Sequence, residues 1–182
     1  HMPGRIVEVG SGHSTRFLAQ AVLDGGLETQ ITCIDPSPKA AITGLPPVKH
    51  LPVLAQTVDI SEMTVGCGDI LFIDSSHILM PGSDVDIFLN RVCPLLPAGS
   101  LVHIHDILLP DDYPEAWAWR GYNEQSGVGA LLQGGEWLIE WSSHYIATRM
   151  QAALQNSVLG QLPLIDGALE TSLWLRKITK GS

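Results

Sequence analysis

The sequence has little positive charge and no long apolar run. It contains 10 Lys and Arg residues against 19 Asp and Glu residues, and its formal net charge is -9. Because nucleic acids and anionic membranes attract basic patches, this balance predicts that neither is a partner. No segment has the length and hydropathy of a membrane span or of a signal peptide. The composition therefore predicts a cytoplasmic protein that acts on small molecules.

Cysteine is also scarce, which limits the structural roles it can have. The three cysteines lie in or beside apolar segments and lack the paired spacing of a metal site, so they are predicted to be reduced, buried thiols: Cys33, Cys67 and Cys93. The length of 182 residues and the hydrophobic content of 45% predict one domain with a sizeable core. We expect this domain to span residues 3–180, with residues 1–2 and 181–182 as cloning remnants.

Strand and helix patterns alternate along the chain, which is typical of an α/β fold whose parallel sheet is covered on both faces. Between the fourth and fifth strands, Ser83 is predicted to cap a helix that has Asp84 and Asp86 in its first turn and stops at Pro94. Seven strands are predicted, near residues 5–9, 30–35, 49–54, 69–74, 100–105, 136–141 and 172–177.

The segment R-I-V-E-V-G-S-G, Arg5 to Gly12, joins the first strand to a glycine turn. Gly10 and Gly12 allow a tight turn and a close approach of the backbone to a ligand. Ser11 or Ser14 is predicted to cap the helix that follows. The apolar face of that helix is predicted to consist of Phe17, Leu18, Ala21 and Val22.

Two residues around this turn bear on which nucleotide it binds. Thr15 stands where a dinucleotide-binding fingerprint has its third glycine. Glu8, near the end of the strand, is predicted to point toward the ligand and to suit a cationic ligand better than a pyrophosphate. Asp35 ends the next strand before Pro36, where an aspartate can be only a turn former.

With the strand Ile31–Asp35, the glycine turn resembles the first two motifs of class I S-adenosylmethionine-dependent methyltransferases. The resemblance implies a three-layer, Rossmann-like sheet of seven mostly parallel strands whose last two strands form a hairpin-like edge. Helices usually precede the first strand in this family, whereas the turn here begins by residue 10, so we expect a fragment or an unusually short member. The implied cofactor-binding residues are Glu8, Gly10, Ser11, Gly12, Ser14, Asp35 and Asp74. The resemblance implies that Asp35 binds the ribose hydroxyls.

A second informative region combines I-D-S-S-H, Ile73 to His77, with H-I-H-D, His103 to Asp106. Both follow predicted strands, and ligands bind at the carboxyl ends of strands in open α/β sheets. Asp74 should therefore meet His77, His105 and Asp106, with His103 on the same side as His105. His77, His105 and Asp106 are the predicted catalytic residues, with a histidine taking the proton of an acceptor hydroxyl. In the alternative, one of His103 and His105 is a core residue.

The same cluster is similar to the metal site of the metal-dependent O-methyltransferases within class I. The resemblance implies a divalent cation on Asp74, His105 and Asp106. A histidine in the middle position weakens the case for Mg²⁺ and admits Mn²⁺, Fe²⁺, Zn²⁺ or no metal. The four lysines are predicted to lie away from this cluster, which leaves histidine as the base: Lys39, Lys49, Lys177 and Lys180.

The acceptor is predicted to meet the segment Leu108–Gln125, which follows the fifth strand. Trp117 and Trp119 are two residues apart and cannot share one helix face, so one of them should face away from the core. A planar substrate is predicted to stack on Tyr113, Trp117 and Tyr122, with polar groups from Asp111, Asp112, Arg120 and Glu124. A docking face for preceding helices or for a second subunit of a homo-oligomer is the alternative.

These observations predict S-adenosylmethionine-dependent methyl transfer to a small molecule, at a hydroxyl oxygen, with or without a metal. Two other functions stay open. A nicotinamide-dependent oxidoreductase would share Gly10, Gly12 and Asp35, but it would need a glycine in place of Thr15 and a substrate domain. A catalytically silent cofactor-binding or scaffold module is the second alternative.

Overall fold

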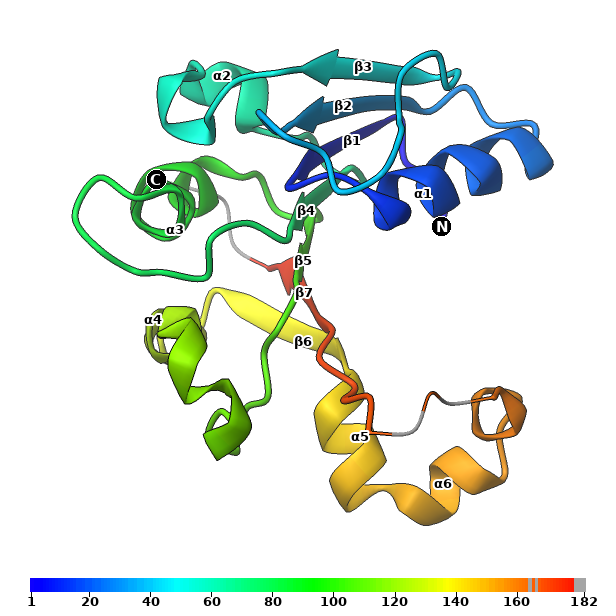
Figure 1. Cartoon of the computed structure of the whole chain (residues 1–182), viewed down its shortest axis with the longest axis vertical. Helices are drawn as coiled ribbons and strands as arrows, with labels where there is room; N and C mark the ends of the chain where they lie inside the picture. Colours follow the sequence, from blue (N-terminus) through cyan, green and yellow to red (C-terminus); the bar gives the residue numbers. More distant parts are fainter. Residues whose placement is uncertain (164, 166, 179–182) are drawn as a thin grey trace.

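A computed structural model describes residues 1–163, 165 and 167–178. Residues 179–182, which include Lys180, the end of the predicted domain and one of the two predicted cloning remnants, lie outside this described part. The sheet has seven strands in the order β3-β2-β1-β4-β5-β7-β6. All are parallel except β7, which runs antiparallel to both β5 and β6. The predicted fold class and the hairpin-like edge are therefore confirmed (Figure 1).

The strands agree with the predicted ones to within a few residues, because buried parallel strands are short, almost continuous apolar runs. The largest difference is at β3, which leaves the sheet after Leu51 although it was predicted to run to residue 54. The strands are β1 (Arg5–Val9), β2 (Gln30–Ile34), β3 (Val48–Leu51), β4 (Ile70–Ile73), β5 (Leu101–Ile104), β6 (Trp137–Ser142) and β7 (Leu173–Lys177).

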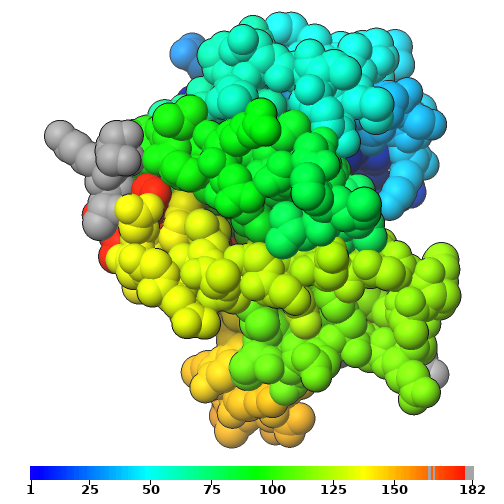
Figure 2. Space-filling view, turned by 90° about the vertical axis from the view of Figure 1, so that its left-hand side faces the viewer, coloured from blue at the N-terminus to red at the C-terminus, as the bar shows by residue number. Residues whose placement is uncertain are grey.

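Helices cover both faces of the sheet (Figure 1). On one face lies α1 (His13–Asp24), packed on a core that includes Ile6, Ile31 and Ile70. The opposite face carries the larger core, under a layer in which the segments of α2, α3 and α4 adjoin without a break (Figure 2). That layer comprises η1 (Ala55–Thr57), α2 (Ile60–Met63), α3 (Asp84–Ile87), η2 (Phe88–Val92), η3 (Cys93–Leu95) and α4 (Glu124–Gln133).

The remaining short helices lie outside these two layers. One, η4 (Glu115–Arg120), belongs to the segment after β5. The others separate β6 from β7: α5 (Ser143–Arg149), α6 (Gln151–Gln155) and η5 (Leu159–Gln161). Among the described residues, no helix is long and apolar enough to cross a membrane.

Local predictions were met unevenly. Ser83 does cap α3, since its side chain accepts a hydrogen bond from the backbone of Asp86. The predicted serine cap of α1 is wrong, because Gly12, which has no side chain, holds the N-cap position. All three cysteines are free, but Cys67 is exposed and not buried as predicted.

The predicted apolar face of α1 is also partly wrong. Phe17 is 77% exposed and Ala21 is exposed, whereas the buried residues are Thr15, Ala19 and Val22. The prediction followed the large apolar side chains. The structure instead turns small ones toward the sheet, which allows the helix to pack closely on it.

Candidate active site

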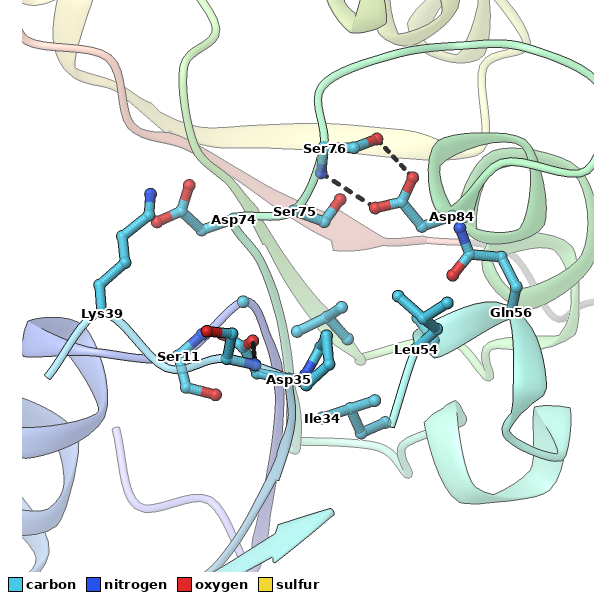
Figure 3. A pocket seen from close by; sticks show the side chains of 15 residues that line it. Ser11, Ile34, Asp35, Lys39, Leu54, Gln56, Asp74, Ser75, Ser76 and Asp84 are labelled. Atoms are coloured by element: carbon cyan, nitrogen blue, oxygen red, sulfur yellow. Dashed lines mark hydrogen bonds between the residues drawn. The ribbon is translucent and has the colours of Figure 1, made fainter. Parts of the chain in front are cut away.

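The carboxyl ends of β1, β2 and β4 surround a cavity of about 290 Å³ (Figure 3). Gly10 makes this possible, since its φ is +80° and an added Cβ atom would lie 1.7 Å from the carbonyl oxygen of Asp74. No residue with a side chain fits there, so β1 and β4 can approach each other only with glycine at this turn. The predicted role of Gly10 in a tight turn is confirmed.

The cavity wall combines an apolar end with polar groups that have no partner. Ile34, Leu54 and Ala55 lie at the apolar end. The hydroxyl oxygens of Ser11 and Ser75 are buried and make no hydrogen bond. Because buried polar groups are normally paired, these two hydroxyls indicate a ligand that supplies the missing partners.

Asp35 lies at the entrance to the cavity and is only partly buried. One carboxylate oxygen accepts a hydrogen bond from the backbone N–H of Ser11, at 2.6 Å, and the other from that of Ser37, at 2.7 Å. Asp35 therefore shapes the turn, as one of the two predictions for it stated. Its carboxylate also remains at the wall of the cavity, where the other prediction needs it.

Glu8 does not face the cavity, contrary to the prediction. It is fully buried on the α1 side of β1, where its carboxylate accepts hydrogen bonds from Ser14, at 2.6 Å, and from Thr15. Thr15 in turn accepts one from the backbone of Gly12 at 3.0 Å. Burial raises the pKa of Glu8 despite these bonds, which also include the Cys33 thiol. Thr15, which departs from the dinucleotide pattern, thus ties the glycine turn to β1.

Several residues of the cavity wall were missed by the sequence analysis. Lys39, predicted to lie away from the site, extends along one side with its amine directed toward Asp74 (Figure 3). Ser76 donates a backbone hydrogen bond of 2.9 Å to the buried carboxylate of Asp84, which fixes the loop after β4. Gln56 belongs to η1, the short helix that follows β3.

Beside the cavity, the loops after β4 and β5 bring together the predicted cluster, and Asp74 belongs to both regions. Its Oδ1 atom lies 3.3 Å from Nε2 of His77 and 3.5 Å from Nδ1 of His105. Nδ1 of His105 is also 3.1 Å from Oδ1 of Asp106, at an angle that gives an electrostatic contact but no hydrogen bond. Both His77 and Asp106 adopt left-handed backbone conformations, with φ of 58° and 55°. Such strained residues cluster at functional sites.

His77 is the centre of this cluster and is only 3% exposed. Its Nδ1 atom lies 2.8 Å from Oε2 of Glu124, which is 47 positions away in the sequence and is also buried. Burial opposes protonation of His77, but hydrogen bonds with Asp74 and Glu124 outweigh it and raise the pKa to about 9. Glu124, predicted to face the substrate, instead holds this imidazole.

The other charged groups respond to one another in the same way. Burial alone would raise the pKa of Asp74 and of Asp106, yet the two imidazoles lower both. Burial alone would lower the pKa of His105, but Asp106 and Asp74 raise it. Within the cluster, the imidazoles and the carboxylates therefore favour one another's charged forms.

His103 and His13 lie apart from this set. His103 is buried between Phe72 and Trp174, with ring centroids 3.9 Å and 4.7 Å from its own. Burial lowers its pKa to about 3, so it is neutral. The core alternative is right for His103, while His13 is exposed at the start of α1.

The arrangement does not fit the predicted metal. Among the described residues, no group of three or more His, Cys, Asp or Glu side chains is placed to hold a metal ion. Asp74 and Asp106 both direct carboxylate oxygens at the Nδ1 atom of His105, at 3.5 Å and 3.1 Å, and not at a common point where a cation could lie. The three predicted ligands are thus neighbours, but they form ion pairs with one another.

The strand order and the site at its carboxyl edge define a class I methyltransferase fold. The family model of the methyltransferase domain matches residues 7–107, more than half of the chain, and the chain belongs to this family. A comparison with curated proteins found no match.

Solved structures of methyltransferases share the fold at low sequence identity. The plantazolicin methyltransferase BpumL, in complex with S-adenosylhomocysteine, is 15% identical with a TM-score of 0.58 over 98% of this chain and 77% of its own. A protein from Clostridium thermocellum, provisionally named an rRNA methylase, is 15% identical with a TM-score of 0.52 over 97% and 90%. Phosphoethanolamine N-methyltransferase 2 of Haemonchus contortus, in complex with S-adenosyl-L-methionine, is 13% identical with a TM-score of 0.52 over 98% and 49%.

Proposed function

We propose that the chain binds S-adenosylmethionine in the cavity and transfers its methyl group to the hydroxyl oxygen of a small molecule held over the His77 cluster. The observation that carries this proposal is the position of Asp74, which lines the cavity and contacts both imidazoles. A cofactor in the cavity and an acceptor at the cluster would therefore adjoin. Such positioning supplies much of the acceleration of a two-substrate reaction.

The cavity residues suit the parts of this cofactor. Asp35 would accept hydrogen bonds from the ribose hydroxyls, and the apolar end formed by Ile34, Leu54 and Ala55 would receive the adenine. Ser11 and Ser75 carry hydroxyls that need partners, and Lys39 is a cation that suits the methionine carboxylate. Glu8, Gly12 and Ser14 would not contact the cofactor directly. They would support its binding by fixing the glycine turn.

Bound S-adenosylmethionine supplies a methyl group on a positively charged sulfur. The two imidazoles then have different tasks. His77, held by carboxylates on both ring nitrogens, keeps its proton and stabilises negative charge that develops on the acceptor oxygen. His105, whose side chain is 40% exposed, acts in its neutral form and takes the hydroxyl proton, while Asp106 orients its ring.

Titration calorimetry with S-adenosylhomocysteine and NAD, side by side on the same protein, tests the cofactor. We expect S-adenosylhomocysteine to bind and NAD not to bind. Binding of NAD without binding of S-adenosylhomocysteine would overturn the proposal. For the chemistry, His105→Ala and His77→Asn should abolish methyl transfer without loss of S-adenosylhomocysteine binding. The matched control is His13→Ala, which alters an exposed histidine. Full turnover in both cluster variants would remove the cluster from the mechanism.

No metal-bound step enters this proposal. A chelator added to the active enzyme should leave the rate of methyl transfer unchanged, because the carboxylates of Asp74 and Asp106 face imidazoles. If the chelator abolished activity and Mn²⁺ or Mg²⁺ restored it, a metal would take part in the reaction and this part of the proposal would be wrong.

A further inference from the structure

The guanidinium group of Arg120 lies at the edge of the His77 cluster, on an aromatic surface. Arg120 ends η4, and its guanidinium carbon is 4.1 Å from the ring centroid of Trp117 and 5.4 Å from that of Tyr122. Its Nη1 atom is 3.6 Å from Oδ2 of Asp106. Two aromatic faces thus hold this cation in place beside a residue of the proposed active site.

The hydrogen-bonding capacity of Arg120 is largely unused. Its Nε atom is buried and has no hydrogen-bond partner. Its nearest carboxylate, on Asp106, is shared with His77, His105 and Thr171. A guanidinium has five N–H donors, so most of them are free for another acceptor.

Three other cations of the described chain differ in this respect. Arg149 is bound by both carboxylate oxygens of Asp111, and Arg176 is bound by Glu140. Lys177, which is buried, lies 2.6 Å from Glu136. Each of these cations has its own carboxylate partner, as in structural ion pairs. The carboxylate beside Arg120 also contacts two histidines.

A continuous aromatic surface connects Arg120 to His77. The rings of Tyr113, Trp117 and Tyr122 have centroids 5.9 to 6.1 Å apart, and the Tyr122 ring is 4.5 Å from that of His77. Trp119 is 81% exposed, so one of the two tryptophans faces away from the core, as predicted. Tyr122 is nearly perpendicular to Tyr113 and Trp117, at 72° and 79°, so a planar ring would pack against the edges and faces of this aromatic group, with the guanidinium at one end and the imidazole at the other.

We propose that the methyl acceptor is a hydroxy-substituted aromatic carboxylate, with its carboxylate on Arg120 and its hydroxyl toward His77 and His105. The inference rests on the proposed function. A planar guanidinium binds a carboxylate through two parallel hydrogen bonds. A monoanion fits better than a phosphate, because a single guanidinium is available and Asp106, Asp74 and Glu124 lie close by. Arg120 is then a specificity-determining residue.

The test compares acids with neutral analogues of the same shape. The 2-, 3- and 4-hydroxybenzoates and the matching hydroxybenzamides are titrated calorimetrically into the wild-type complex with S-adenosylhomocysteine, and their kcat/KM values for methylation are measured. We expect at least one acid to bind, and its kcat/KM to exceed that of its amide by about 10- to 100-fold. Arg120→Gln should abolish this preference, so that kcat/KM for the acid falls to that for its amide. Arg120→Lys should retain part of it.

The matched control is Arg176→Gln, which removes an arginine far along the chain whose partner is Glu140. It should keep the full preference for acids. Retained binding of S-adenosylhomocysteine shows that Arg120→Gln is folded; if that variant does not bind it, Arg120→Lys carries the test. The inference is overturned if no hydroxybenzoate binds to the wild-type complex, or if acid and amide are used equally. Failure of S-adenosylhomocysteine itself to bind would instead overturn the proposed function.

Discussion

The cofactor cavity and the His77 cluster adjoin at Asp74 but satisfy their polar groups in opposite ways. In the cavity wall, the hydroxyls of Ser11 and Ser75 are buried without partners. In the cluster, His77 has a carboxylate at each ring nitrogen. The cavity is therefore arranged to gain hydrogen bonds from a ligand, whereas the cluster already stabilises its own charges. An acceptor entering the cluster must replace contacts between the imidazoles and the carboxylates. Beside the cluster, Arg120 has an Nε–H group without a hydrogen-bond partner.

The largest predicted effect concerns the shape of the cavity. Gly10→Ala should abolish S-adenosylhomocysteine binding and lower the free energy of unfolding by about 3 kcal/mol or more, because the new Cβ atom would overlap the Asp74 carbonyl at a φ of +80°. Calorimetry and denaturant unfolding measure the two effects.

Gly44→Ala is the matched control for this change. Gly44 has a similar φ of +77°, but nothing lies within 4 Å of its Cβ position. It should lose only about 1 kcal/mol and keep ligand binding. Equal losses in the two variants would mean that backbone strain alone, and not the approach of β1 to β4, makes Gly10 necessary.

The second prediction concerns stability and pH, and it should separate the cluster from the cavity. The pKa of His77 is 6.5 in the unfolded chain and about 9 in the folded one. The stabilisation is therefore fully present below pH 6.5 and is lost as pH rises through 9. We expect the free energy of unfolding to fall by about 1 to 3 kcal/mol between pH 6.5 and 9.5.

His77→Asn should remove most of this pH dependence, since asparagine tolerates the left-handed φ of 58° but cannot carry the charge. Asp35→Asn, in the cavity, should leave the pH dependence as it is in the wild type. A wild-type profile that stays flat across this range would show that His77 is neutral in the folded protein, and the proposed division of tasks between the two histidines would then be wrong.

The third prediction concerns cofactor affinity. Asp35→Ala should weaken S-adenosylhomocysteine binding by about 1.5 to 3 kcal/mol, the value of hydrogen bonds to a charged group. Because the carboxylate also accepts bonds from the backbones of Ser11 and Ser37, a modest loss of stability should accompany it. Unchanged affinity would leave Asp35 as a turn former only.

The comparison also explains which parts of the site could be predicted from sequence. Strand ends follow from apolar runs and glycines, so the positions of Gly10, Asp35 and Asp74 at one edge were predictable. Glu8 was predicted wrongly, although side chains alternate along β1 and this alternation places Glu8 with Ile6 beneath α1.

Long-range partners gave no comparable signal. Glu124 holds His77 across 47 positions, and no periodicity links the two residues. Lys39 reaches the cavity because the loop after β2 folds back, with the Lys39 N–H bonded to the carbonyl oxygen of Ser11 at 3.0 Å. Such loop conformations depend on tertiary contacts and turn geometry, which a pattern of apolar residues does not encode.

The smallest predicted effect concerns Lys39 and distinguishes the two halves of the cofactor. Lys39→Ala should weaken S-adenosylhomocysteine binding by about 0.5 to 1 kcal/mol, because the amine is exposed and its attraction to the methionine carboxylate is screened by solvent. It should not affect the binding of 5′-methylthioadenosine, which lacks that carboxylate. Asp35→Ala should weaken both compounds equally, since both carry the ribose. If Lys39→Ala weakened both ligands alike, Lys39 would act by packing on the glycine turn, where its Cβ atom lies 3.2 Å from a Cβ position at Gly12, and the carboxylate would have to bind elsewhere.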